Sequence, residues 1–142
     1  ESVLRRLRAG YGSCTLFAFG RGEATFLGAT PERLVRRDGN AVSATCLAGS
    51  APRGRTPDED AALGQALLAS AKERHEHALV VRALREALAP VCSRLSLAGA
   101  PGLLAMPNVQ HLHTPVEGTL CGEQDLLACL EKAQAGRIAR RP

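Results

Sequence analysis

The sequence predicts an α+β fold, in which antiparallel strands form a meander and long helices pack outside the sheet. The first third of the chain consists of short apolar, β-prone runs separated by turn residues. Asp38-Gly39 lies between two such runs, which is a strong signal for a β-hairpin. From Thr56 onward, apolar residues recur at helical spacing. Because strands and helices are segregated rather than alternating as β-α-β units, the pattern favours the α+β class.

The strands of the first third are placed by their composition and by the turns between them. We expect strands at residues 14–19, 24–29, 33–37 and 41–47. Residues 48–55 are rich in Gly, Pro and Arg, and we expect them to form a loop.

The start of the helical region carries three independent signals. Thr56 is suited to the N-cap, Pro57 to the first helical position, and Glu59 completes a capping box. The helix is expected to end just before Pro90, either as one long helix or as two that are broken near Ser70.

The last third is expected to contain a loop, a strand and a second helix. Residues 96–107 are loop-like, and residues 108–120 alternate as a strand does. Pro115 should make this an edge strand or interrupt it, because proline donates no ladder hydrogen bond. We expect an amphipathic helix over residues 122–135 and an irregular basic tail at 136–142.

Length, charge and cysteine usage exclude several classes of protein. The 142 residues suit one ordinary domain, and a net charge of +4 comes from scattered arginines with few aromatic residues. Nucleic-acid binding is therefore not favoured. No run reaches the ~18 apolar residues of a membrane span, and the first ten residues lack the apolar core of a signal peptide. The five cysteines are odd in number and show no CxxC pair, as in a reduced cytoplasmic protein.

Glu32 is the first candidate for chemistry. It follows Thr30-Pro31 at the end of an expected strand. This residue could be a surface glutamate in a hairpin connection. It could instead be a carboxylic acid presented to a cleft, where it would donate a proton.

Glu73 and Glu76 are candidate metal ligands. They lie three residues apart on the expected helix and so share a face, and two carboxylates suit Mg²⁺. His75 and His77 should point to nearly opposite sides, so this is not a zinc motif. The alternative is a solvated charged face with internal pairs such as Lys72–Glu76.

Gly49 and Ser50 are candidates for binding an anionic ligand, and His111 is a further candidate site residue. Gly49 and Ser50 follow an expected strand, where glycine lets backbone N–H groups approach an anion. His111 should share one face of its strand with Val109 and His113. An ordinary loop and a structural histidine are the competing interpretations.

Four segments together resemble the chorismate-utilising enzymes. Residues 26–34 (FLGATPERL) are similar to the family pattern F-x-G-[AS]-[ST]-P-E-x-L, and residues 47–50 (LAGS) to its L-A-G-[ST] loop. Residues 68–77 (LASAKERHEH) resemble its L-x-x-[SD]-x-K-[DE]-R-x-E-[HN] helix, and residues 109–112 (VQHL) its V-x-H-L strand. The Arg-His-Glu-His version is most similar to the isochorismate synthases of menaquinone and siderophore pathways.

The resemblance implies a role for each candidate residue. Glu32 would be the general acid, Glu76 a ligand of Mg²⁺, and Glu73 a second or outer ligand. Gly49 and Ser50 would bind a carboxylate of chorismate, and His111 would line the pocket. The reaction implied is the Mg²⁺-dependent isomerisation of chorismate to isochorismate.

The resemblance also implies that residues 1–142 form only part of a chorismate-binding domain. The family's water-activating lysine lies upstream of its T-P-E segment, and a further glutamate lies downstream. We therefore expect the chain to lack turnover by itself. An anthranilate or salicylate synthase, a non-catalytic remnant and a small anion-binding protein remain alternatives. The oligomeric state is open.

Overall fold

The computed structural model of the chain describes residues 2–122 and residue 131. These residues belong to two compact units, Glu1–Arg33 and Leu34–Pro142. The helix expected over residues 122–135 and the irregular tail expected at 136–142 lie almost wholly outside the described residues.

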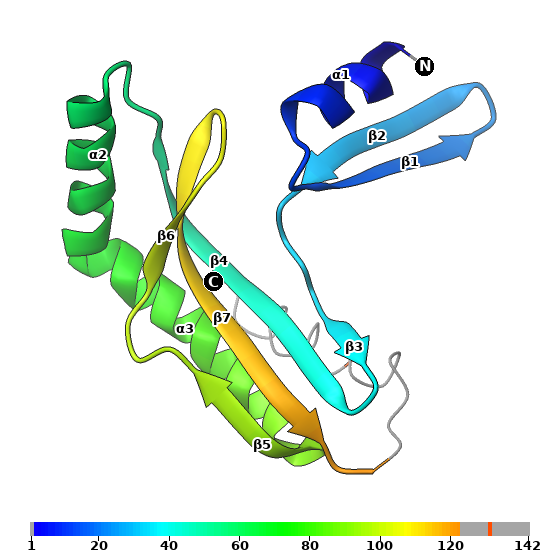
Figure 1. Ribbon diagram of the computed structural model, residues 1–142, viewed down its shortest axis with the longest axis vertical. Helices are drawn as coiled ribbons and strands as arrows, with labels where there is room; N and C mark the ends of the chain where they lie inside the picture. Colours follow the sequence, from blue (N-terminus) through cyan, green and yellow to red (C-terminus); the bar gives the residue numbers. More distant parts are fainter. Residues whose placement is uncertain (1, 123–130, 132–142) are drawn as a thin grey trace. The chain divides into compact units, whose positions relative to one another are not determined.

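The first unit consists of a short helix and a β-hairpin (Figure 1). The elements are α1 (Ser2–Gly10), β1 (Thr15–Arg21) and β2 (Ala24–Thr30). The two strands pair antiparallel, as the sequence predicts, and Gly22 takes the turn with a φ of 59°. Phe17 lies opposite Gly28, where a side chain would clash with the Phe17 ring at 2.8 Å. The helix was not predicted, because its nine residues carry three arginines and only short apolar runs.

The second unit is built on an antiparallel sheet of five strands. Its elements are β3 (Arg36–Asp38), β4 (Ala41–Pro52), β5 (Cys92–Leu97), β6 (Gly102–Ala105) and β7 (Val109–Leu120). The strand order is β3-β4-β7-β5, and β6 also pairs with β7. The expected strands of the first third are therefore divided between two sheets. The turn between β3 and β4 is the predicted hairpin, with Gly39 at a φ of 57°.

The helical region is two helices, as the break near Ser70 predicts. They are α2 (Pro57–Ala69) and α3 (Ala71–Leu88), and a 3-10 turn follows at Ala89–Val91. Thr56 caps α2 by accepting the Glu59 N–H at 3.2 Å. The Glu59 carboxylate accepts the N–H of Arg55 rather than that of Thr56, so the capping box is only half formed. Ser70 ends α2 and also caps α3, where its hydroxyl accepts the Glu73 N–H at 3.3 Å.

The sheet differs from the sequence prediction in three places. β4 continues to Pro52 through the loop expected at 48–55, because β7 supplies a partner for residues 50–52. The loop expected at 96–107 contains the end of β5 and all of β6. The expected strand 33–37 is reduced to β3.

Pro115 neither interrupts β7 nor places it at an edge, which corrects the prediction. β7 is an inner strand of the sheet. On one side of β7, residues 110–113 pair with β6 and residues 116–120 pair with β5. Pro115 lies in the gap between these partners, where a missing N–H removes no ladder hydrogen bond.

Both helices lie on one face of the sheet, with α3 running behind β5 and β7 in Figure 1. Side chains from both layers form the core, as the α+β prediction requires; they are Val42, Ala44, Cys46, Leu84, Leu88, Val91, Val116 and Leu120. The strand residues among them alternate with outward-facing residues, as expected for a half-buried sheet.

An ion pair joins the end of β4 to the first turn of α2. The Arg53 guanidinium donates two hydrogen bonds to the Asp60 carboxylate, at 2.7 and 2.6 Å, and a third to the Met106 carbonyl. The Gly54 N–H also donates to Asp60 at 2.8 Å. These bonds, from Arg53 first and Gly54 second, lower the pKa of Asp60 to about 2.

Replacing Asp60 by asparagine should destabilise the chain at neutral pH, and this difference should shrink in acid. The pKa of Asp60 is lowered on folding, so its contribution is fully present above about pH 4 and is lost as the pH falls toward 2. Guanidinium unfolding at pH 7, 4 and 3 measures the effect. Asp58→Asn, two residues earlier in the same first turn of α2, is the matched control. An equal loss for both variants, or no dependence on pH, would contradict the prediction.

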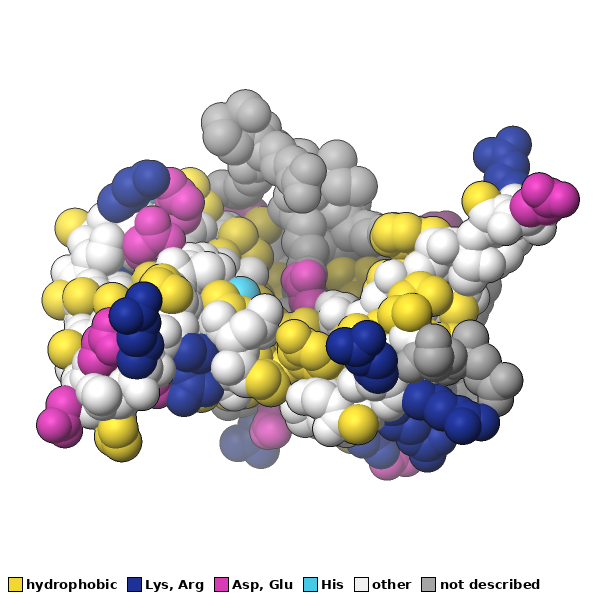
Figure 2. Space-filling model, turned by 90° about the horizontal axis from the view of Figure 1, so that it is seen from above, with side chains coloured by type: hydrophobic (Ala, Val, Ile, Leu, Met, Phe, Trp, Pro, Cys, Tyr) yellow, Lys and Arg dark blue, Asp and Glu magenta, His cyan; other side chains and the backbone are white. Residues whose placement is uncertain are grey.

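Charged side chains lie in several separate groups on the surface (Figure 2). On the face shown in Figure 2, Lys and Arg side chains lie in several groups, with Asp and Glu side chains beside some of them. No described helix is both long enough and apolar enough to cross a membrane. The four described cysteines, Cys14, Cys46, Cys92 and Cys121, form no disulfide.

Candidate functional site

A β-bulge in β4 is the centre of the candidate site. Leu47 pairs with His113 and Ser50 with His111, so Ala48 and Gly49 together lie opposite the single residue Leu112. Before the bulge, even-numbered residues of β4 such as Cys46 face the helices. One extra residue reverses this alternation, because side chains in a strand alternate with a period of two.

The bulge therefore places Ser50 beside His111 on the face opposite the helices. The Ser50 hydroxyl lies 2.8 Å from the Nδ1 atom of His111, across 61 positions of sequence. His111 and His113 share this face, as the sequence predicts, and Leu112 between them is buried on the helix side. Ser50 and His111, two of the three residues predicted to contact the substrate, are thus in direct contact.

Gly49, the third of these residues, lies against the helix α3. Its φ is +82°, a region that favours glycine. A methyl group on Gly49 would lie 3.0 Å from the Glu73 Oε2 atom and 3.1 Å from Leu112 Cδ1. The carboxylate of Glu73 is therefore packed over the bulge, which joins a candidate metal ligand to the candidate anion site.

His77, one helical turn after Glu73, is tied to the same bulge. It is only 2% exposed. Its Nδ1 atom lies 3.0 Å from the Ala48 carbonyl oxygen, and its Nε2 atom lies 2.8 Å from the Thr114 hydroxyl. A carbonyl can only accept, so Nδ1 carries the proton and Nε2 accepts from Thr114. Burial lowers the pKa of His77; the Ala48 bond partly opposes this, and His113 adds a smaller lowering effect.

His77 is not among the residues that the sequence predicts for the site. Helical spacing predicts that His75 and His77 point apart, and the structure agrees, because His75 is exposed whereas His77 is buried. The available signal was the spacing of four residues from Glu73, which places both side chains on the face of α3 that meets the bulge.

Glu76 lies on a more exposed part of α3. Its side chain is 54% exposed and pairs with Lys72 at 3.9 Å, as the alternative of a solvated charged face predicts. Within residues 2–122 and 131, no three His, Cys, Asp or Glu side chains gather as a metal-binding group. The donor set that α3 offers is thus two carboxylates, Glu73 and Glu76. Such a set fits Mg²⁺, which often takes one or two protein carboxylates and completes its shell with water and substrate.

Glu32 lies in the first unit, directly after β2. Its side chain is exposed, and its N–H donates to the Thr30 hydroxyl at 3.2 Å, which fixes the turn around Pro31. Its role as an acid stays a prediction.

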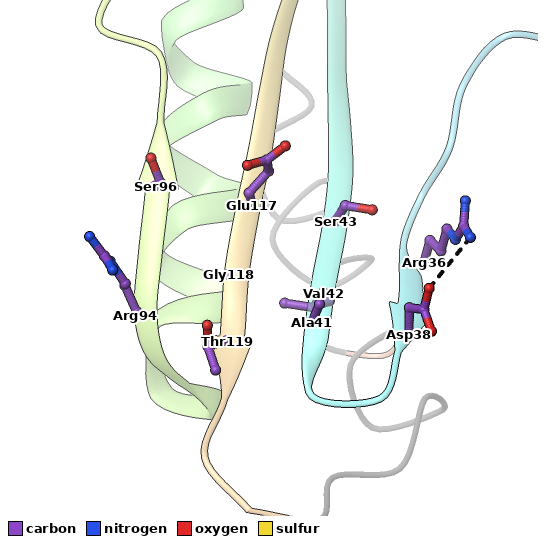
Figure 3. A pocket seen from close by; sticks show the side chains of 10 residues that line it. All are labelled: Arg36, Asp38, Ala41, Val42, Ser43, Arg94, Ser96, Glu117, Gly118 and Thr119. Carbon is purple, nitrogen blue, oxygen red and sulfur yellow. Dashed lines mark ion pairs between the residues drawn. The ribbon is translucent and has the colours of Figure 1, made fainter.

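Two hollows lie elsewhere on the second unit. One, of about 670 Å³, crosses β3, β4, β7 and β5 and contains none of the candidate residues (Figure 3); its lining is Arg36, Asp38, Ala41, Val42, Ser43, Arg94, Ser96, Glu117, Gly118 and Thr119. The other, of about 760 Å³, lies between α3 and the connection from β5 to β6. His77 and Thr114 contribute to its lining.

Replacing Gly49 by alanine should destabilise the chain by more than backbone strain alone. The positive φ costs a residue with a Cβ about 1–2 kcal/mol, and the methyl group must also displace Glu73 or Leu112. Gly39→Ala is the matched control, because its φ is 57° and nothing lies within 4 Å of the added methyl group. Denaturant unfolding of both variants measures the difference. Equal losses would show that the bulge is not crowded.

The sequence is similar to known chorismate-binding enzymes. Residues 1–133 match the family described as chorismate binding enzyme. The chain is 50% identical over 130 residues to the salicylate biosynthesis isochorismate synthase of Pseudomonas aeruginosa, which covers 91% of this chain and 27% of that protein. It is 37% identical over 132 residues to the isochorismate synthase MenF of Bacillus subtilis, covering 93% and 28%. The chain therefore belongs to the chorismate-binding enzyme family.

A solved structure shows the same fold. DhbC from Bacillus anthracis superposes with a TM-score of 0.84 at 33% identity, over 94% of this chain and 41% of that one. The α+β class and the family resemblance are confirmed. The chain spans little more than a quarter of the length of the two curated relatives.

Proposed function

We propose that this chain is part of a Mg²⁺-dependent isochorismate synthase that converts chorismate to isochorismate. The observation that carries the proposal is the bulge of β4, where Ser50 contacts His111 on one face of the sheet and Gly49 lies against Glu73 on the other. Relatives named as isochorismate synthases support the choice of reaction.

The substrate is a dicarboxylate, and the bulge offers it hydrogen-bond donors. In the tautomer with a proton on Nδ1, His111 donates to the Ser50 oxygen, which leaves the Ser50 hydroxyl proton free to face a carboxylate. Gly49 adds a position where the backbone can approach closely. Together they would hold one carboxylate and orient the ring.

The reaction requires a proton for the hydroxyl that leaves, because hydroxide is a poor leaving group. Water adds at one ring carbon while this hydroxyl departs from another. Glu32 would be the general acid, and its backbone is held by the Thr30 hydroxyl.

Glu76 and Glu73 would hold the metal ion. Mg²⁺, when bound, neutralises the charge of a substrate carboxylate. The position of Glu73 supports this role, because a carboxylate packed on Gly49 would repel an anionic ligand there unless a cation lay nearby.

The test is a chorismate assay of the natural protein that carries this sequence, with Mg²⁺, with EDTA, and with and without ammonia. We expect isochorismate as the product, loss of turnover in EDTA and no effect of ammonia. Anthranilate formed only with ammonia, or salicylate as the direct product, would replace the proposal by the corresponding synthase.

The proposal also covers the pathway that isochorismate enters and the cellular location of the protein. The names of the relatives connect isochorismate synthases with salicylate biosynthesis, and a solved structure with 28% identity to this chain is of a MenF described as menaquinone-specific. We propose a menaquinone or siderophore pathway and a cytoplasmic location, the latter because five widely spaced cysteines without a CxxC pair are typical of a reduced protein.

A further inference from the structure

The buried imidazole of His77 connects two parts of the candidate site that are distant in sequence. Its Nδ1–H bond to Ala48 crosses 29 positions and ends on the bulge itself. Its Nε2 bond to Thr114 crosses 37 positions and ends on β7. Both ring nitrogens are therefore used, and the side chain is locked between α3 and the two central strands of the sheet.

The bond to Ala48 acts on the residue next to the positive-φ glycine. A bulge has an incomplete ladder, because Ala48 and Gly49 share one opposing residue. Its geometry therefore depends more on outside contacts than that of a paired strand. The Ala48 carbonyl is held from the same turn of α3 that carries Glu73 and Glu76.

We propose that His77 is a positioning residue: its Nδ1–H bond to the Ala48 carbonyl fixes the bulge so that Gly49 and Ser50 face the substrate. This rests on the proposed function, since it assigns Gly49 and Ser50 to a substrate carboxylate. The competing role is a structural histidine that stabilises the fold without affecting substrate binding.

The test compares three variants of the natural protein. In His77→Asn the amide nitrogen takes the place of Nδ1 and keeps the bond to Ala48. In His77→Gln the amide reaches the place of Nε2 and keeps only the Thr114 bond. Thr114→Val removes the Thr114 bond and leaves the tie to the bulge. If the glutamine variant does not fold, His77→Met, which fills the volume without a donor, takes its place.

We expect the KM for chorismate to rise in the variant that loses the hydrogen bond to Ala48 and to stay nearly constant in the variants that keep it. The KM for chorismate should rise about tenfold in His77→Gln, with a smaller change in kcat, and stay within about twofold in His77→Asn and Thr114→Val. A structural histidine would instead give KM values unchanged in all variants that fold. Equal KM values for the asparagine and glutamine variants, or a rise in Thr114→Val as large as in His77→Gln, would overturn the proposal.

Amide hydrogen exchange of the segment 47–52 provides a readout that is independent of the reaction. Exchange should be faster in His77→Gln than in His77→Asn and Thr114→Val, because only the first variant releases the bulge. If the wild-type protein does not convert chorismate, the proposed function fails, while the exchange comparison still decides whether His77 holds the bulge. Equal exchange in all variants would refute the positioning role.

Discussion

Replacing Glu32 by glutamine should reduce chorismate turnover by about 10²- to 10⁴-fold, the usual contribution of a positioned general acid. Glutamine has nearly the same shape as glutamate but cannot deliver a carboxyl proton. The backbone at this position is held by the Thr30 hydroxyl and by Pro31, neither of which depends on the side chain that is changed. The affinity for chorismate should therefore be largely retained.

The measurement is kcat and, separately, equilibrium binding of chorismate to the variant. Glu23→Gln, in the turn of the same hairpin, is the control for loss of a surface carboxylate in this unit. Wild-type rates in Glu32→Gln would remove this residue from the acid role. Lost binding together with lost turnover would place it among the binding residues instead.

Replacing Glu76 by glutamine should weaken Mg²⁺ activation on the order of 100-fold, and replacing Glu73 should weaken it about tenfold. Glu76 is assigned as a direct ligand and Glu73 as a second or outer one. The stability cost of the Glu76 change should be small, because its pair with Lys72 is long and exposed and such pairs contribute only about 0–1 kcal/mol.

A direct Mn²⁺ or Mg²⁺ titration of each variant, beside the activity assay, measures this pair of effects. Lys72→Gln controls for the loss of the ion pair without the loss of a ligand. If Glu73→Gln lost more metal affinity than Glu76→Gln, the two assignments would be exchanged. If neither variant changed metal affinity, α3 would not be the metal-binding helix.

The sequence predicts correctly those helix and strand ends that depend on residues close by in the chain. The two helices begin at Thr56 and Ser70, whose hydroxyls cap the following turns. The hairpin at Gly39 requires a positive φ that glycine supplies without strain. Each of these contacts lies within three residues of its partner or within one turn, so the sequence window contained the whole interaction.

Long-range pairing decided the features that the sequence did not predict. Residues 50–52 continue β4 only because β7 pairs with them across some sixty positions of chain, and β6 exists only as a partner of β7. Pro115 suggested an edge strand, but the change of partner from β5 to β6 gave it a place inside the sheet. Composition alone holds no information about these partners.

In the candidate site, too, the sequence predicts individual residues but not the long-range contacts between them. Motif resemblance identified Gly49, Ser50, His111 and Glu73 as separate positions. It did not show that Glu73 packs on Gly49 or that Ser50 contacts His111, because those contacts follow from the register of β4 and β7. The hydrogen bond between the buried His77 and the Ala48 carbonyl was also not predicted, because it joins residues that are 29 positions apart in the chain.

The extra residue in β4 also limits how the length of this segment can vary. Most connections on a protein surface accept insertions and deletions with little cost. Removal of Ala48 or Gly49 would instead restore an unbroken ladder. Ser50 would still lie opposite His111, but the bulge would lose either the Ala48 carbonyl that contacts His77 or the positive-φ Gly49 that lies against Glu73. Natural variants of this chain should therefore keep the spacing from Leu47 to Ser50 constant, even where the side chains differ.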